Sequence, residues 1–154
     1  MSSHIYFCGQ LPFRLSRAAL DETTARFNER AELCWFGFQG LFNEAAVAVV
    51  HLTRHDADDL GGRRRAALNG GLISAGFDAA AVLVGVCHSD IDTVVTIELS
   101  VRFLRLPHVE QADQFAARVV RLTNSMAFVG GALRTSWDGA QFPFATLTAM
   151  IAPA

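Results

Sequence analysis

The sequence contains no lysine, and charged residues make up only 18% of its 154 positions. Thirteen arginines against fifteen acidic residues give a formal net charge of −2. The broad basic surface typical of a nucleic-acid-binding domain is therefore missing. Cysteines are few, at Cys8, Cys34 and Cys87, with no Cys-x-x-Cys pair, which argues against a metal cluster or a disulfide framework. We expect them to be reduced core residues.

Targeting and membrane signals are lacking as well. The first four residues do not show the basic-then-apolar order of a signal peptide. The longest apolar stretch, Leu72 to Cys87, is interrupted by Ser74 and Asp78 and is too short for a membrane span. The acidic segment from His51 to Asp59 matches no known spacing of metal ligands. We expect a cytoplasmic protein with no metal, no cofactor, no membrane span and no nucleic-acid partner.

The chain is rich in apolar residues. Hydrophobic residues make up 51% of it, and its mean hydropathy is +0.28. A chain of this length buries enough surface to fold without disulfides, so we predict one domain over residues 1–154, with residues 1–30 as an N-terminal extension and helix. The surplus apolar surface indicates that part of it is covered by another copy of the chain.

The hydrophobic pattern predicts two helices. The first, from about Leu15 to Arg30, has one apolar stripe and begins at a cap, Ser16 or Asp21. The second, Asn69–Val86, is apolar on every side and must be buried all round. Its alanines favour helix, and Gly76 and Gly85 allow neighbouring backbone to pack closely.

Short runs of aromatic, β-branched or alternating residues predict six strands. They are Leu33–Phe38, Ala45–Leu52, a long strand from Thr93 that Pro107 ends, Gln114–Leu122, Met126–Trp137 and Phe142–Ile151. We expect hairpin connections at Gln39–Glu44 and at Asp138-Gly139. The order of these elements predicts an α+β fold in which an antiparallel sheet curls around the buried helix.

Asp78 stands out in the middle of the buried helix. An aspartate is almost never fully buried unless it is paired. One hypothesis is a structural ion pair with Arg102 or Arg105. The other is a catalytic carboxylate at the edge of a pocket.

The start of the same helix provides a second candidate group. Asn69-Gly70-Gly71 exposes backbone N–H groups at the positive end of the helix dipole, which suits a developing negative oxygen; Asn69 as a simple helix cap is the alternative. Gly71 lies roughly 10 Å and Asn69 roughly 13.5 Å from Asp78 along the axis. If both groups act on one substrate, one of them must come from a second chain, which predicts two equivalent sites per dimer.

The segment from Asn69 to Asp78 resembles the His-Gly-Gly-(six residues)-Asp signature of the hotdog-fold acyl-CoA thioesterases of the phenylacetate-degradation type, in the 4-hydroxybenzoyl-CoA thioesterase superfamily. Thr96–Arg105 resembles the family's following long strand, and Trp137-Asp138-Gly139 with Phe144–Ala149 resembles its last hairpin. The resemblance covers about Glu32 to Ile151.

This resemblance implies a hotdog fold, a homodimer or homotetramer, and hydrolysis of an acyl-CoA to a free acid and CoA. The residue matching Asp78 acts there as nucleophile or general base, and the N–H matching Gly71, from the partner subunit, polarises the carbonyl. A hydroxyl residue matching Thr96 positions the water or the carboxylate. Strand alternation places Thr96 on the face with Glu98 and Arg102, so its entry to the site requires a bulge or an interface position.

Two departures from the family pattern affect the mechanism. Asn69 stands where the family has His, so this position can hold a carbonyl but cannot titrate near neutral pH. Asn124-Ser125 replaces a Gly-Arg pair, which bears on how the CoA tail is held. The alternatives are a non-catalytic acyl-CoA- or lipid-binding hotdog protein and, third, a hotdog dehydratase.

Substrate-binding candidates flank these residues. Arg63, Arg64 and Arg65 precede the helix, and Arg102 and Arg105 lie near the end of the long strand; in a thioesterase they would meet the CoA phosphates, although a triple-arginine loop is also an ordinary solvated charge run. We expect the aromatic group Trp35, Phe36, Phe38 and Phe42 to be mostly core, with part of it lining a pocket for an aryl or medium-chain acyl group.

Overall fold

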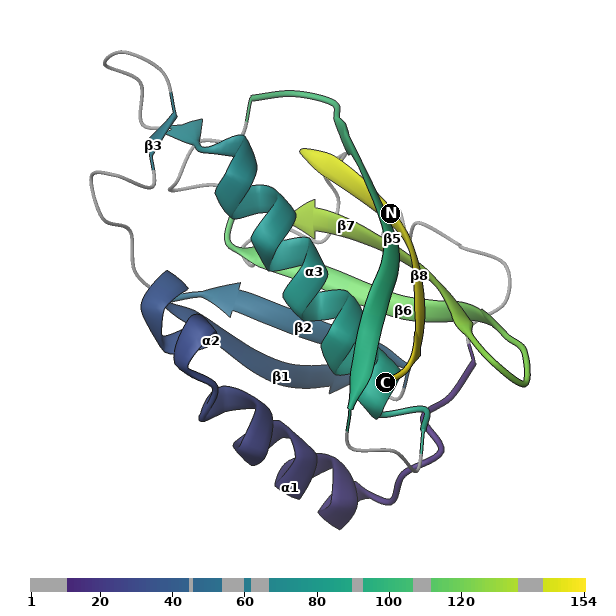
Figure 1. The fold of residues 1–154 in the computed structure, drawn as a ribbon. Helices are drawn as coiled ribbons and strands as arrows, with labels where there is room; N and C mark the ends of the chain where they lie inside the picture. The colour runs from purple at the N-terminus through teal and green to yellow at the C-terminus, as the bar shows by residue number, and fades with distance from the viewer. Residues whose placement is uncertain are drawn as a thin grey trace, which may run out of the picture.

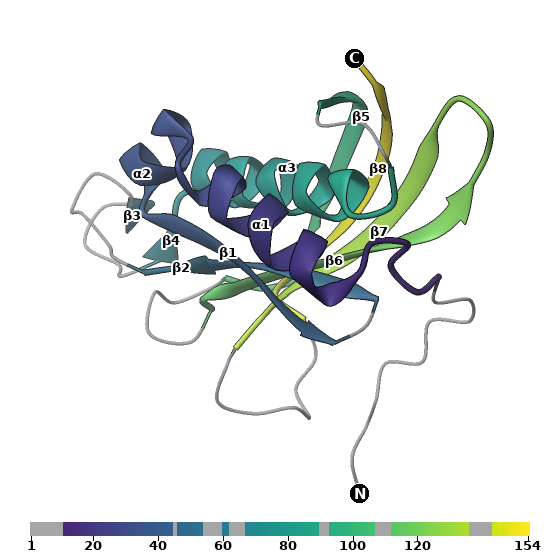
Figure 2. The same ribbon diagram turned by 90° about the horizontal axis from the view of Figure 1, so that it is seen from below.

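A six-stranded antiparallel sheet curves around one long helix, α3 (Gly70–Val86), in the computed structural model (Figures 1 and 2). The structure describes residues 11–44, 46–53, 60–61, 67–89, 93–106, 112–135 and 143–154. The strands stand in the order β1-β2-β6-β7-β8-β5. They are β1 (Phe38–Glu44), β2 (Val47–Leu52), β5 (Val94–Phe103), β6 (Gln114–Leu122), β7 (Ala127–Arg134) and β8 (Ala145–Pro153).

Helix α3 packs against the concave face of the sheet. Phe77, Ala80, Ala81, Leu83 and Val84 on α3 are completely buried. Two glycines let the helix approach the sheet. A Cβ at Gly76 would lie 2.5 Å from the Phe115 ring, and one at Gly85 would collide with Ile151. The close neighbours of these glycines are thus side chains of the sheet, not backbone as the sequence had suggested.

One stripe of α3 is not fully buried. Ser74, Ala75, Asp78, Ala79 and Val82 are only partly covered. The sheet covers one side of the helix and leaves the opposite stripe partly open, so burial all round is incomplete within one chain; that a second subunit covers the rest stays a prediction. The stripe contains Asp78 and faces the N-terminal helices.

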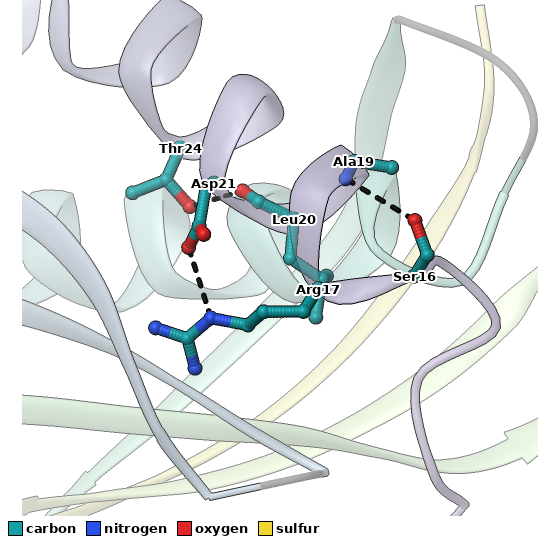
Figure 3. Close-up of polar contacts among 6 residues, drawn as sticks. All are labelled: Ser16, Arg17, Ala19, Leu20, Asp21 and Thr24. Atoms are coloured by element: carbon teal, nitrogen blue, oxygen red, sulfur yellow. Dashed lines mark hydrogen bonds and ion pairs between the residues drawn. The ribbon is translucent and has the colours of Figure 1, made fainter.

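The first N-terminal helix, α1 (Arg17–Asn28), confirms the helix predicted over Leu15–Arg30 with shorter bounds. Ser16 is its cap, because the Ser16 hydroxyl accepts a hydrogen bond from the Ala19 N–H (3.3 Å, Figure 3). Asp21 instead forms an exposed ion pair with Arg17 one turn away (3.1 Å). Leu20 and Phe27 form the buried side of the helix.

A second short helix, α2 (Ala31–Phe36), replaces the strand predicted over Leu33–Phe38. Short apolar runs are ambiguous between helix and strand, and here Leu33 and Phe36, three residues apart, face inward while Trp35 is 73% exposed. Gly37 ends the helix in a left-handed conformation (φ 73°) that glycine adopts without strain. The predicted connection Gln39–Glu44 is also wrong, because these residues belong to β1 and the turn follows Glu44.

A side-chain clamp fixes α1 to the outer edge of β1. Asn28 Nδ2 donates to the Gly40 carbonyl (3.0 Å), and the Gly40 N–H donates to Asn28 Oδ1 (2.6 Å). Gly40 is required here because a Cβ would meet Phe27 and Leu83 at 2.8 Å. The Thr53 N–H and hydroxyl both donate to the Gly37 carbonyl (2.8 Å each). The segment from α1 to β1 is therefore firmly attached to the sheet.

The other elements agree in the main with the sequence pattern. Strands β2 and β6 and helix α3 lie close to their predicted bounds. Strands β7 and β8 pair antiparallel as predicted, although Trp137, the Asp138-Gly139 turn and Phe142 lie outside the described residues. Between β2 and α3 the described residues include two short strands that pair with each other, β3 (Leu60–Gly61) and β4 (Ala67–Leu68).

Among the cysteines, Cys87 is buried as expected, but Cys34 is exposed on α2, so the prediction of a core position is wrong for Cys34; Cys8 lies outside the described part of the chain. With its single long helix in the concavity of an antiparallel sheet, the α+β architecture is the hotdog fold that the sequence resemblance implies.

Candidate active site

Asp78 lies on the partly open stripe of α3, eight residues after the helix begins. The helix forms because Asn69 caps it and an alanine-rich apolar sequence follows. Packing of Phe77 and Ala81 against the sheet turns Asp78 away from the core. Its side chain is half-buried rather than enclosed, which keeps a carboxylate accessible to a ligand.

Thr96 on β5 holds this carboxylate. The Thr96 hydroxyl donates to Asp78 Oδ1 at 2.6 Å, a short distance typical of a hydrogen bond to a charged oxygen. Within the described residues Asp78 forms no ion pair with Arg102 or Arg105, and Oδ2 accepts no hydrogen bond. Ser74, the nearest polar residue on the same stripe, donates to the Gly70 carbonyl instead (3.0 Å).

A bulge in β5 brings Thr96 to this position. The pairing of β5 with β8 shifts register between Thr96 and Glu98. Strict alternation would place Thr96 opposite to Leu99 and Val101, but all three are partly buried while Ile97 and Glu98 are exposed. The extra residue therefore moves Thr96 to the side of the strand that faces α3. A bulge in this strand is one of the two conditions, a bulge or an interface position, under which we expected Thr96 to enter the site.

A pocket of about 110 Å³ opens beside Asp78. One side of it is the α3 stripe, with Ala75, Ala79 and Val82. The facing wall comes from α1, α2 and the start of β1. Its apolar members are Phe27, Leu33, Phe36 and Phe38, and its charged members are Arg30 and Glu32. Asp78 is thus the carboxylate on the α3 side of the cavity, Arg30 and Glu32 are the charged residues on the facing wall, and the rest of the lining is apolar.

The sequence identified this pocket only in part. Phe36 and Phe38 were candidates for an acyl pocket, and both line it, stacked with ring centroids 5.3 Å apart. Trp35 is exposed, and Phe42 packs against Phe13 (5.0 Å) instead. The sequence did not identify the other residues of this wall, Phe27, Arg30, Glu32 and Leu33. The wall depends on helix α2 and on the turn at Gly37, and the apolar sequence of α2 had been predicted as a strand.

Asn69 and Gly71 lie together at the other end of the stripe. Asn69 Oδ1 accepts a hydrogen bond from the Gly71 N–H at 2.7 Å, so Asn69 caps the helix. Gly71 is exposed. The end of β5 packs here, since a Cβ at Gly70 would lie 3.5 Å from the Phe103 ring. The candidate residues of one chain therefore form two groups, Asp78 with Thr96 and Asn69 with Gly71, separated by about two turns of helix.

The candidate arginines are placed in part. Arg102, near the end of β5, and Arg105, two residues after it, are exposed. The Arg105 guanidinium lies over the Phe144 ring, 4.1 Å from its centroid. Arg63, Arg64 and Arg65 lie outside the described residues.

Two groups with perturbed pKa values, Cys87 and His88, lie at the end of α3, away from Asp78. Burial raises the pKa of the Cys87 thiol to about 12, which makes it a poor nucleophile. Burial, with a smaller contribution from the Arg14 charge, lowers the pKa of His88 to about 4. In the described ranges, no three His, Cys, Asp or Glu side chains cluster in a way that would hold a metal ion. His51 pairs with Asp113 (2.9 Å).

Comparison with known proteins identifies similar sequences and folds. Residues 66–139 match the family model described as the thioesterase superfamily. A mutant thioesterase from Pseudomonas aeruginosa is 13% identical, with a TM-score of 0.73 over 92% of this chain and 97% of that chain. The E. coli PaaI protein, from the phenylacetic acid degradation operon, is 16% identical, with a TM-score of 0.67 over 90% and 96%.

A thioesterase family protein from Silicibacter pomeroyi is 18% identical, with a TM-score of 0.69 over 86% of this chain and 96% of that chain. At such identities the likeness establishes the fold. No curated protein sequence matches the chain significantly. No helix among the described residues is long and apolar enough to cross a membrane.

Proposed function

We propose that this chain, a member of the thioesterase superfamily, hydrolyses an acyl-CoA thioester to a free acid and CoA, with Asp78 as its catalytic carboxylate. One observation carries the proposal. Asp78 is held by the Thr96 hydroxyl at 2.6 Å on the boundary of an apolar pocket, an arrangement that suits attack on the carbonyl carbon of a bound acyl group.

The chemistry assigned to Asp78 is activation of water. Oδ1 is engaged by Thr96, which leaves Oδ2 to accept a proton from a water molecule. The water oxygen bonds to the carbonyl carbon of the thioester and forms a tetrahedral intermediate. When this intermediate collapses, the C–S bond breaks, and the CoA sulfur leaves with the proton that Asp78 returns.

We place the donors to the carbonyl oxygen on a second subunit. Strand β5 is at the edge of the sheet, yet Val95, Ile97 and Phe103 on it are 42%, 58% and 56% exposed. An apolar edge strand is a site for pairing with another chain. Antiparallel pairing of two β5 strands about a two-fold axis would set the Thr96 end of one strand beside the Phe103 end of the other.

This pairing supports a shared site. Asp78 is bonded to Thr96 near the beginning of β5, and the start of α3 packs against Phe103 at its end. Two antiparallel β5 strands therefore bring Asp78 of one subunit toward Gly71 of the other. The Gly71 N–H donates to Asn69 Oδ1 in the unliganded chain; the substrate carbonyl would replace that acceptor, with the Asn69 amide as a further donor. Arg102, Arg105 and Arg63–Arg65 are assigned to the CoA phosphates.

The test is release of free thiol from a panel of acyl-CoA thioesters by the purified protein. Asp78→Asn keeps the shape of the side chain and removes its basicity, so we expect kcat to fall at least about a hundredfold. Asp21→Asn is the matched control, because it neutralises an exposed aspartate whose ion pair with Arg17 is of little energetic value. Turnover that survives Asp78→Asn would refute the mechanism.

Subunit mixing tests whether the site is shared. Gly71→Pro removes the N–H donor in the first turn of the helix, where proline is best tolerated. If the site is shared, a heterodimer of the Gly71→Pro and Asp78→Asn chains has one intact site and recovers about half of the wild-type activity per dimer. Mixed chains that stay inactive despite forming heterodimers would contradict the shared site.

A non-catalytic acyl-CoA-binding protein is the second candidate. The observation that favours it is the bond from the Gly71 N–H to Asn69 Oδ1 (2.7 Å), which occupies the donor that catalysis requires. The same thiol-release assay decides between the two. Binding of acyl-CoA measured by calorimetry without any turnover would support the binding protein.

A further inference from the structure

The wall that faces Asp78 across the pocket comes from residues 27–38, outside the segment 66–139 that matches the family model. It is formed by the end of α1, by α2 and by the start of β1, which lie beside α3 in both views (Figures 1 and 2). Residues shared with the family thus supply Asp78, and a separate part of the chain shapes the space next to it.

The lining of this space suits the acyl part of a thioester. Three phenylalanine rings, Phe27, Phe36 and Phe38, face Ala79 and Val82. Such a surface stabilises an apolar group through burial, and Arg30 is the one cation among the residues that line this pocket. A thioester whose carbonyl carbon lies at Asp78 would therefore place its acyl group inward and its CoA part outward.

The size of the pocket limits what it accepts. An apolar protein cavity of about 150 Å³ holds one benzene molecule, and this pocket measures about 110 Å³ with an open side. The pocket therefore accommodates most of one ring or of a short branched chain, whereas most of a long straight chain would have to project through the open side. The small residues Ala75 and Ala79 on α3 provide the room, and the ring of Phe36 limits it.

The wall is also held in place. Asn28 forms two hydrogen bonds with Gly40 (3.0 and 2.6 Å), and Thr53 donates twice to the Gly37 carbonyl. The Arg30 guanidinium lies 5.2 Å from the centre of the Phe27 ring. A wall anchored on both sides of α2 cannot yield easily to a longer substrate, so it discriminates by size.

We propose that the α2–α3 pocket is the acyl-binding subsite and that it selects compact acyl groups, of one ring or a short branched chain, over long straight chains. This inference rests on the proposed thioesterase function, and it names Phe36 and Ala79 as specificity-determining residues. Phenylacetyl-CoA, acetyl-CoA and decanoyl-CoA serve as probes of compact, minimal and long acyl groups.

Two substitutions with opposite effects test the pocket. Ala79→Leu fills it, so the ratio of kcat/KM for phenylacetyl-CoA to that for acetyl-CoA falls about tenfold or more. Phe36→Ala enlarges it, so the ratio for decanoyl-CoA to phenylacetyl-CoA rises by a similar factor. Val120→Ala, on β6 and 38% exposed, removes an apolar side chain that does not line the pocket; it is the control and changes either ratio less than about threefold. Ala75→Leu repeats the filling test if Ala79→Leu fails to fold.

A binding measurement separates this inference from the proposed function. Calorimetry with the three thioesters on the Asp78→Asn background reports acyl selectivity without turnover. If the wild-type protein hydrolyses no thioester but Ala79→Leu still weakens phenylacetyl-CoA binding about tenfold, the subsite stands and the thioesterase proposal fails. If hydrolysis occurs and neither pocket variant changes the ratios, the subsite is wrong and the thioesterase proposal stands. If the wild-type protein hydrolyses no thioester and Ala79→Leu does not weaken phenylacetyl-CoA binding, both the subsite and the thioesterase proposal are wrong.

Discussion

Replacing Thr96 with valine removes one hydrogen bond from the candidate site and little else. Valine has the shape of threonine and favours a strand, so β5 and its bulge should persist. The lost bond joins Thr96 Oγ1 to Asp78 Oδ1 at 2.6 Å. Hydrogen bonds to charged groups contribute about 1.5–3 kcal/mol, and because both residues are half-buried we expect the lower part of that range. If the bond positions Asp78 in the transition state, kcat falls about 10- to 30-fold.

The assay is initial-rate thiol release with the best thioester of the panel. We expect the loss in kcat and little change in KM, because Thr96 contacts the catalytic carboxylate and does not itself line the pocket. Thr96→Ser keeps the hydroxyl and should retain most of the activity. A Thr96→Val enzyme with kcat within about twofold of wild type, or a serine variant as damaged as the valine one, would refute the positioning role.

A double-mutant cycle of stability tests the same bond without turnover. Thr96→Val, Asp78→Ala and the double variant are compared by urea unfolding, and the coupling free energy should be about 1–2 kcal/mol. Additive effects of the two substitutions would mean that the 2.6 Å contact contributes nothing to the folded state.

Two further predictions concern stability. Asn28→Ala breaks both hydrogen bonds with Gly40 and should lower the free energy of unfolding, measured by urea titration, by about 1–3 kcal/mol. The control, Arg17→Ala, breaks an exposed ion pair and should change it by less than about 1 kcal/mol. Equal losses in the two variants would contradict the clamp. The pKa of His88 is about 4 in the folded protein against about 6.5 in the unfolded chain, so the unfolded state binds the proton first as the pH falls. The free energy of unfolding therefore contains the full contribution of His88 above about pH 6.5. This contribution, on the order of 3 kcal/mol, is lost as the pH falls toward about 4. Urea unfolding at several pH values should show a shallower acid-side decline for His88→Phe than for wild type, and identical declines would refute the assignment.

The sequence predicted those parts of the fold whose signals are local and repeated. Helix α3 is specified locally by the cap Asn69 and the alanine-rich apolar sequence that follows it. In the same way, α1 is specified by the cap Ser16 and the apolar stripe that follows. Period-two alternation identified β5, but it cannot reveal a bulge, and the position of Thr96 depends on one. Leu33–Phe36 was assigned to the wrong element type because a run as short as the six residues Leu33–Phe38 fits a helix or a strand equally well. Only the left-handed conformation of Gly37 decides between them.

The same limits apply to the candidate site. Asp78 could be found from the sequence because burying a carboxylate in an apolar helix costs free energy unless an interaction compensates for it. The pocket could not, because its wall joins residues about forty to fifty positions away from the α3 stripe, and no local pattern encodes that contact. The clamp at Gly40 was invisible for the same reason, since Asn28 resembles any polar residue at a helix end.

The clamp at Gly40 has a consequence for assembly. In a sheet of six strands, hydrogen-bonding capacity remains at the two outermost ones, β1 and β5. Asn28 takes up the outward N–H and C=O of Gly40 and so stands where the backbone of an incoming strand would bind. If the β1 edge is blocked and the β5 edge is free, each sheet can pair with one other sheet, through β5. The paired sheets then end on both sides in blocked β1 strands, so no third sheet can add. The placement of this one amide would thus favour a finite pair over a fibre.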